Sequence, residues 1–380
     1  MLRRILNIDW LLFSATIPLL GAGLITMKGL VSQIEPLANG LPSRTGDYFF
    51  TRQIIWIFLA FLLFFIFSSI DWRFLKSGGL LLLLLIANLI LLVFLHFFGA
   101  STRGASRWLS LGSFSISPAD PVKLLLVLIL AKYFSRRHVE IANIKHILIS
   151  ATYTVIPAIL VFFQPDFGSA IIIFAIWLGM VMVSGISKKH LLLVFLVAFI
   201  IFSVSWFFIL KPYQKNRILT FLDPLKDPKG AGYNALQSMI AVGSGRILGK
   251  GIGYGTQSRL EFLPEHQTDF IFAAFAEEWG LTGVTIIFIF FALVIWRILK
   301  NAFNGQSNFE RLFGIGLAIF LVVQSAIHIG MNIGLLPVTG VPLPFMSYGG
   351  SNLLTVFAGL GILMGMRRYS INIPDEPYLI

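Results

Sequence analysis

The chain has 380 residues, of which 57% are hydrophobic and only 12% are charged, and its mean hydropathy is +0.86. This composition excludes a soluble globular protein of this size. The formal net charge is +12, but the basic residues are scattered through short polar connections without interleaved aromatics, so we expect no nucleic-acid partner. The lack of cysteine excludes disulfides, thiolate metal ligands and thiol nucleophiles.

Apolar segments long enough to cross a hydrocarbon core of about 30 Å as α-helices recur along the chain. The sequence therefore predicts an all-α fold: a polytopic integral membrane protein of about ten transmembrane helices, forming one membrane domain over residues 1–380. The first segment follows Arg3 and Arg4 but lacks a convincing cleavage motif, so we expect an uncleaved span. In chain order the segments are 10–30, 54–70, 78–98, 119–134, 146–163, 168–185, 190–210, 269–299, 311–333 and 348–366.

Basic residues occur in every second connection between these segments, for example Lys188 with Lys189 and Arg367 with Arg368. The positive-inside rule then places both termini in the cytoplasm. Membrane lipids are expected around the bundle. Three polar connections fall on the external side, at 99–118, 211–268 and 335–351. Long and chemically varied loops tend to carry function, so we expect the external side to be the working side. Prolines and glycines in 335–351 predict an irregular segment that dips back toward the membrane.

The first candidate for chemistry is Asp269, an acid at the start of the eighth span, preceded by the polar run 265–268. An ionisable group at a lipid boundary is expensive unless it is solvated, paired or used. Burial and nearby charges can tune its pKa, and a general base works best when its pKa is near the operating pH. The alternative is that Thr268 or Asp269 caps the helix by accepting from its free amides.

Further candidates also have structural alternatives. Asp120 and Lys123 lie three residues apart, so a helix places them together as either a neutralised buried pair or a site for an anionic ligand. Asp166 follows a proline near a helix start, where capping is the simpler interpretation. Arg107 and Trp108 could form an interfacial pair or a platform for a sugar phosphate.

The long external connection contains Arg217, Lys250 and the glycine-rich run 242–255. Such a run can expose backbone amides to phosphate. This one lacks the strand and helix context of a nucleotide-binding loop, and a flexible connector is the alternative.

Taken together and in this order, these motifs resemble the SEDS family (shape, elongation, division and sporulation) of bacterial cell-wall polymerases, over nearly the whole chain, and look most like its elongation branch. The resemblance is carried by Gly104-Ala105-Ser106-Arg107-Trp108; Gln164-Pro165-Asp166; Tyr213-Gln214 with Arg217; Phe221-Leu222-Asp223-Pro224; Asp227-Pro228; Gly249-Lys250-Gly251; Leu263-Pro264-Glu265; Thr268-Asp269-Phe270; and Ser347-Tyr348-Gly349-Gly350-Ser351. The chain has Asp120 where we expect glutamate in the family, and His266 where arginine is common.

The resemblance implies a peptidoglycan glycosyltransferase that polymerises lipid II on the outer face of the bacterial cytoplasmic membrane during elongation. It implies Asp269 as the catalytic base, undecaprenyl pyrophosphate as the leaving group and a class B penicillin-binding protein as the transpeptidase partner. Cations for the leaving group would come from basic side chains, with a divalent cation (Mg²⁺ or Mn²⁺) as a further candidate. The expected substrate-binding residues are Arg107, Trp108, Asp120, Lys123, Asp166, Arg217, Lys250, Glu265, Gln267 and Ser347. A flippase for lipid-linked precursors and a non-catalytic scaffold for the partner are the competing hypotheses.

Overall fold

The computed structural model describes residues 8–31, 44–77, 79–98, 108–111, 114–136, 144–227, 230, 232–260 and 262–371. Ten of its helices coincide with the ten apolar segments. Seven of these helices are long and apolar enough to cross a membrane, and the total of ten spans stays a prediction. The ten are α2 (Trp10–Val31), α3 (Arg44–Ser69), α4 (Gly79–Phe98), α5 (Ala119–Ser135), α6 (Ile144–Phe163), α7 (Phe167–Val183), α8 (Lys188–Phe208), α12 (Ile271–Phe303), α13 (Asn308–Asn332) and α14 (Gly350–Ile371).

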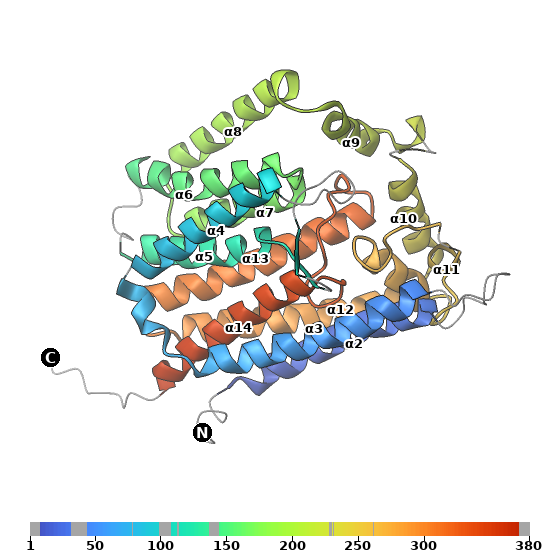
Figure 1. Cartoon of the computed structure of the whole chain (residues 1–380), viewed down its shortest axis with the longest axis horizontal. Coiled ribbons are helices and arrows are strands. Elements are labelled where there is room, and N and C mark those ends of the chain that lie inside the picture. Colours follow the sequence, from blue (N-terminus) through green and yellow to red (C-terminus); the bar gives the residue numbers. More distant parts are fainter. Residues whose placement is uncertain are drawn as a thin grey trace.

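The long helices run side by side in one bundle (Figure 1). Helix α14 packs against α3 and α5, α12 packs against α2 and α13, and α13 also contacts α5 and α7. Helix α8 differs from the others, because none of its residues is buried and it stands apart from the bundle in Figure 1. Its side chains are apolar along most of its length, as expected for a helix surrounded by lipid.

The connections hold the shorter elements. The stretch 211–268, predicted as one long external loop, folds into α9 (Pro212–Leu222), η2 (Pro224–Lys226), α10 (Tyr233–Ser244) and α11 (Thr256–Arg259). A short helix, η1 (Trp72–Ser77), follows α3. The one departure from the predicted all-α fold among the described residues is an antiparallel hairpin of β1 (Leu109–Leu111) and β2 (Phe114–Ile116).

The start of α2 and the end of α14 lie at the same end of the bundle (Figure 1) and are joined by a buried acid, Asp9. Its carboxylate accepts from the Arg297 guanidinium at 2.6 Å and from Asn301 at 2.8 Å, and Arg367 lies 3.3 Å away. Burial alone would raise the pKa of Asp9, but the hydrogen bonds from Asn301 and Arg297 outweigh it and hold the pKa below its ordinary value. Through Arg297 and Arg367, Asp9 therefore connects the start of α2 to α12 and α14.

We expect Asp9→Asn to destabilise the fold by about 3 kcal/mol, because it leaves buried guanidinium charge without its counter-ion. The Asp9 contribution is fully present above the ordinary carboxyl pKa of 3.8 and is lost as the pH falls through the lower folded pKa. Thermal unfolding of the purified protein checks this. A melting temperature that equals that of the wild type at neutral pH would contradict it.

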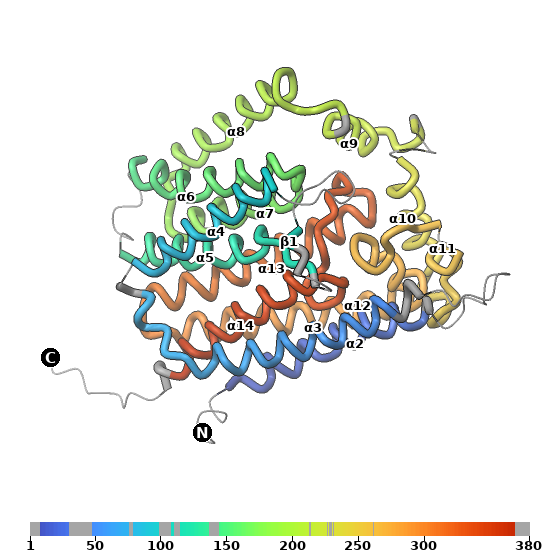
Figure 2. The backbone as a smooth tube through the Cα atoms, in the orientation of Figure 1, coloured from blue at the N-terminus to red at the C-terminus, as the bar shows by residue number. Residues whose placement is uncertain are grey.

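The link between α13 and α14 is irregular, as its prolines and glycines predict, and it is buried within the bundle. Val341, Leu343, Phe345 and Met346 are each at most 2% exposed. Figure 2 traces this link at the end of the bundle that also carries α10. It places backbone carbonyls and amides deep among helices, where they must find hydrogen-bond partners.

Helix α12 is broken at Gly280, whereas the sequence predicted a continuous helix there. Gly280 has φ 63° and ψ −165°, a conformation that is essentially restricted to glycine. The break frees the amides of Leu281 and Thr282, which donate to the carbonyls of Arg246 and Ile247 at 2.9 and 3.0 Å. The first part of α12, which follows Asp269, is therefore a separate short helix held by the chain between α10 and α11.

Candidate active site

Asp269 lies in a tight turn immediately before α12, and its side chain is half-buried. Three successive amides, of Thr268, Asp269 and Phe270, donate to the carbonyl of Glu265 at 3.1, 3.1 and 3.3 Å. Glu265 itself has a positive φ of 53°, which lets the chain reverse direction before the helix. The turn therefore holds Asp269 outside the first helical turn of α12.

The cap of α12 comes from another helix. Phe270 occupies the N-cap position and makes no side-chain cap, and the amide of Ala273 donates to Oδ1 of Asn332 on α13 at 3.2 Å. The Thr268 hydroxyl donates instead to the Glu265 carboxylate at 3.2 Å. The alternative in which Thr268 caps this helix is therefore wrong, because its hydroxyl is used within the turn.

The irregular link braces the Asp269 turn from its other side. The Ser347 hydroxyl donates to the carbonyl of Thr268 at 2.7 Å and accepts from the Leu343 amide at 2.8 Å. The Tyr348 amide donates to the carbonyl of Gln267 at 2.9 Å. Gln267 and Ser347, both predicted to bind substrate, thus take part in holding the turn itself.

Gly340 brings the irregular link close to the Asp269 carboxylate. A Cβ atom built on Gly340 would lie 3.3 Å from Oδ2 of Asp269, and Gly340 has a φ of +72°. Both the space and the backbone conformation favour glycine here. The carboxylate therefore faces a stretch of backbone without a side chain.

Helix α13 carries three buried polar side chains, spaced four residues apart on one face, that hold either this link or the Asp269 turn. Gln324 donates to the carbonyl of Pro342 at 2.8 Å, and Nδ1 of His328 lies 2.6 Å from the carbonyl of Val341. Asn332, the third, reaches the Asp269 turn. Gln324 and His328 therefore bond to irregular backbone, whereas Asn332 also accepts from the Ala273 amide of α12.

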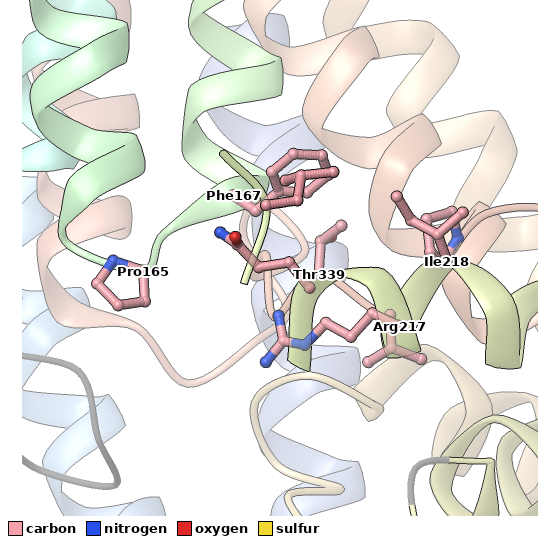
Figure 3. Close-up of a pocket in the computed structure, with 9 residues that line it drawn as sticks. Pro165, Phe167, Arg217, Ile218 and Thr339 are labelled. Carbon is pink, nitrogen blue, oxygen red and sulfur yellow. The ribbon is translucent and has the colours of Figure 1, made fainter. Parts of the chain in front are cut away.

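A pocket at the irregular link is lined mostly by apolar side chains, together with the polar Gln214 and Thr339 and one cation, Arg217 of α9. The pocket is narrow and partly open to the surroundings. Figure 3 shows Arg217 and Ile218 of α9 with Pro165, Phe167 and Thr339 around it. Thr339 precedes Gly340, so pocket and carboxylate share one stretch of backbone. The full lining is Pro165, Phe167, Leu210, Gln214, Arg217, Ile218, Pro337, Val338 and Thr339.

Asp166 caps α7, as its position predicts. Its Oδ1 accepts from the amide of Ser169 at 3.1 Å, and its side chain is buried. Gly168, two residues later, packs against Thr339 and Val341 of the irregular link. The cap therefore also brings the start of α7 to the edge of the pocket.

Asp120 and Lys123 form a buried ion pair of 2.9 Å at the start of α5, as their spacing predicts. The Lys123 side chain is only 1% exposed. Next to the pair, Ser351 of α14 donates to the carbonyl of Ser117, just before α5, at 2.9 Å. The geometry agrees with a neutralised structural pair and does not test the anionic-ligand alternative.

A double-mutant cycle separates these two roles. If the pair is structural, Lys123→Met alone should cost about 3 kcal/mol, because it strands a buried carboxylate, and Asp120→Asn with Lys123→Met should recover much of that loss. Thermal unfolding measures the stability, and the polymerisation that the family resemblance implies measures the activity. Recovery of stability without recovery of activity would show that Lys123 also contacts a ligand.

Lys250 is occupied by a partner within the chain. Its ammonium lies 2.7 Å from Oε1 of Glu277, a fully buried carboxylate of α12, and also donates to Thr256 at 2.8 Å. The amides of Gln257 and Ser258 donate to the same carboxylate. The glycine-rich run is therefore docked against α12, and the flexible-connector alternative is wrong. Arg217 is the better candidate for an anionic ligand, because Lys250 already neutralises a buried acid.

The remaining predicted residues are less informative. Trp108 is half-buried directly before β1, and Arg107 lies outside the described residues. For Glu277 and Asn332 the sequence indicated only hydrogen bonds between helices, and no part in the site. The available signal was their position, since each is a polar residue within an apolar helix next to a segment rich in glycine or proline.

The fold and the site together define a polytopic membrane protein with one half-buried carboxylate beside a largely apolar pocket at one end of a helical bundle. The chain belongs to the FtsW/RodA/SpoVE family of cell cycle proteins, whose model matches residues 15–372.

Several relatives cover most of the chain. Peptidoglycan glycosyltransferase MrdB of Escherichia coli is 43% identical over 288 residues, which are 75% of this chain and 77% of that protein. Stage V sporulation protein E of Bacillus subtilis is 32% identical over 366 residues, 95% of this chain and 97% of that protein.

Solved structures agree with the family assignment. A structure from a study of structural coordination of polymerization and crosslinking by a peptidoglycan synthase complex matches with a TM-score of 0.79 and 30% identity, covering 96% of this chain and 99% of that chain. The rod shape determining protein RodA of Thermus thermophilus matches with a TM-score of 0.69 and 26% identity, covering 96% and 98%.

Proposed function

We infer that this protein is a peptidoglycan glycosyltransferase acting in cell elongation. The family assignment and the activity in the name of a relative at 43% identity support this activity. The observation that carries the chemistry is the placement of Asp269: a half-buried carboxylate in a braced turn at a helix start, next to a pocket that contains Arg217. One acid, one nearby cation and an apolar surface are the parts that glycosyl transfer between lipid-linked sugars requires.

The proposed substrate is lipid II, with undecaprenyl pyrophosphate as the leaving group. In this mechanism Asp269 takes the proton of the acceptor C4 hydroxyl as its oxygen attacks the anomeric carbon of the donor. The bond from that carbon to the pyrophosphate oxygen breaks, and the leaving group departs with the electron pair. An α-linked donor gives a β-1,4 product by inversion, so a single carboxylate base suffices and no covalent intermediate forms.

The leaving pyrophosphate gathers negative charge, which fixed cations stabilise most effectively in a dry site. Arg217 is the proposed contact, because its exposed side chain lines the same pocket as Thr339. Thr339 directly precedes Gly340, which lies next to the Asp269 carboxylate. A divalent cation was the other candidate. Among the described residues no group of three or more His, Asp or Glu side chains could hold a metal, and the mechanism assigns no step to one.

The proposed placement has both termini in the cytoplasm and the Asp269 end of the bundle outside. Arg297 and Arg367 support it, because they lie with Asp9 at the end opposite α10, and the positive-inside rule favours such residues in the cytoplasm. The proposed partner is a class B penicillin-binding protein, which would crosslink the strands made here. Its support is the similarity to a structure studied in a peptidoglycan synthase complex.

The test is polymerisation of purified lipid II by the purified protein, with and without a class B penicillin-binding protein whose own transpeptidase is blocked. We expect glycan strands that resolve as a ladder on a gel. If no strands form under either condition while lipid II crosses sealed vesicles, the protein is a flippase. Absence of both activities, with partner binding retained, would identify a scaffold.

A further inference from the structure

Asn332, the last residue of α13, is fully buried and uses both ends of its side-chain amide at the Asp269 turn. Its Nδ2 donates to the carbonyl of Asp269 at 3.1 Å and to that of His328 at 2.8 Å. Its Oδ1 accepts from the amide of Ala273 at 3.2 Å. A single side chain therefore contacts the backbone of the proposed base and the helix that follows it.

The two backbone groups that Asn332 contacts here, the carbonyl of Asp269 before α12 and the amide of Ala273 within it, are four residues apart. In a continuous α-helix the Ala273 amide would donate to the Asp269 carbonyl, because each amide bonds to the carbonyl four residues earlier. Here the first such bond of α12 runs from Ala274 to Phe270 at 3.0 Å. The bond that would precede it, from the Ala273 amide to the Asp269 carbonyl, is replaced by the side-chain amide of Asn332. Oδ1 of Asn332 accepts from the Ala273 amide, and Nδ2 donates to the Asp269 carbonyl.

Only a group that donates and accepts at once can fill this position, and a side-chain amide is such a group. Without it, the free donor and acceptor would be buried and unpaired, which favours closing the bond and extending α12 backward by one residue. Asp269 would then replace Phe270 as the N-cap residue, and its carboxylate would turn toward the free amides of the first helical turn and leave its place beside Gly340.

We propose that Asn332 is a positioning residue that keeps Asp269 in the turn outside α12, so that its carboxylate stays beside Gly340. The proposal rests on the proposed function, in which that carboxylate is the base. Displacing a catalytic group by about 1 Å can cost about 100-fold in rate. The effect should fall on kcat, because Asn332 is sealed from any ligand by its complete burial.

Ser238 of α10 provides a matched control. Its hydroxyl donates to the Asn332 carbonyl at 2.8 Å and lies 3.4 Å from Oδ1. Ser238→Ala removes a buried hydrogen bond to the same residue but leaves the side-chain amide free to hold Asp269 and Ala273. Any loss that comes only from weaker packing at the end of α13 should appear in both variants.

The experiment compares Asn332→Leu, which has a similar shape without the amide, with Ser238→Ala, the wild type and Asp269→Asn. Asn332→Ala replaces the Leu variant if that variant is not monodisperse. Single hydrogen bonds between transmembrane helices contribute little to stability, so the fold should survive. We expect kcat for lipid II polymerisation to fall about 100-fold in the Asn332 variant, with KM within threefold. Ser238→Ala should keep kcat within threefold. Equal kcat losses in the two variants, or a normal kcat in the Asn332 variant, would overturn the proposal.

Hydrogen exchange of the peptide containing residues 262–273 gives a readout that does not need activity. We expect its exchange rate to change at least threefold in the Asn332 variant and to match the wild type in Ser238→Ala. An unchanged rate would overturn the proposal even if the wild type made no polymer. A changed rate together with an inactive wild type would retain the positioning role and reject the proposed function.

Discussion

Replacing Asp269 by Asn is expected to slow glycan polymerisation by about 10²–10⁴-fold, the usual contribution of a general base. Asparagine has nearly the same shape and leaves the backbone bonds of the turn intact, from the Asp269 amide to Glu265 and from Asn332 to the Asp269 carbonyl. It removes the oxygen that accepts the proton. The initial rate of lipid II consumption by the purified variant measures the effect.

Asp71→Asn is the matched control for this substitution. Asp71 lies between α3 and η1, in an exposed ion pair of 2.7 Å with Arg73. Exposed pairs contribute little, so this variant should polymerise at the wild-type rate. If Asp269→Asn also retained that rate, Asp269 would not be the base.

Gly340→Ala is expected to lower the polymerisation rate by about 100-fold, through displacement of the Asp269 carboxylate. The added methyl would lie 3.3 Å from Oδ2, and the φ of +72° is strained for any residue with a Cβ. The irregular link cannot yield easily, because Val341 on one side is buried and Gln324 and His328 anchor its carbonyls. The same polymerisation assay, with thermal unfolding run beside it, measures the loss.

Gly21→Ala shows what the same chemical change does elsewhere. Gly21 lies within α2, and a Cβ there would meet nothing within 4 Å. Alanine should stabilise this helix slightly and leave activity unchanged. An active Gly340→Ala variant would mean that the close approach of the link to Asp269 has no catalytic consequence.

The sequence was sufficient to predict the ten long helices, because each one is an apolar run bounded by polar residues. It did not predict α9, α10 and α11, which lie within the expected loop 211–268. It also predicted the irregular link through its prolines and the cap at Asp166 through its position before α7. The break at Gly280 was missed. A glycine inside an apolar run is common in membrane helices, and only the docked chain at Arg246 and Ile247 shows why the helix opens there.

The site was less predictable, because its contacts join residues far apart in the chain. Asp269 could be singled out as an acid at a span boundary, but its link to Asn332 spans 63 positions and that of Ser347 to Thr268 spans 79. The sequence indicated Lys250 as a cation for phosphate, whereas in the structure Lys250 pairs with the buried carboxylate of Glu277. Long-range pairing of this kind leaves no periodic signal in a single sequence.

The most direct test is a structure of the protein bound to a lipid-linked acceptor glycan. The account predicts that the acceptor C4 hydroxyl lies about 2.6–3.2 Å from a carboxylate oxygen of Asp269, the reach of a general base, with the glycan beside Gly340 and the pocket of Arg217. An acceptor bound with its C4 hydroxyl at another side chain, and with Asp269 shielded from the sugar, would contradict it.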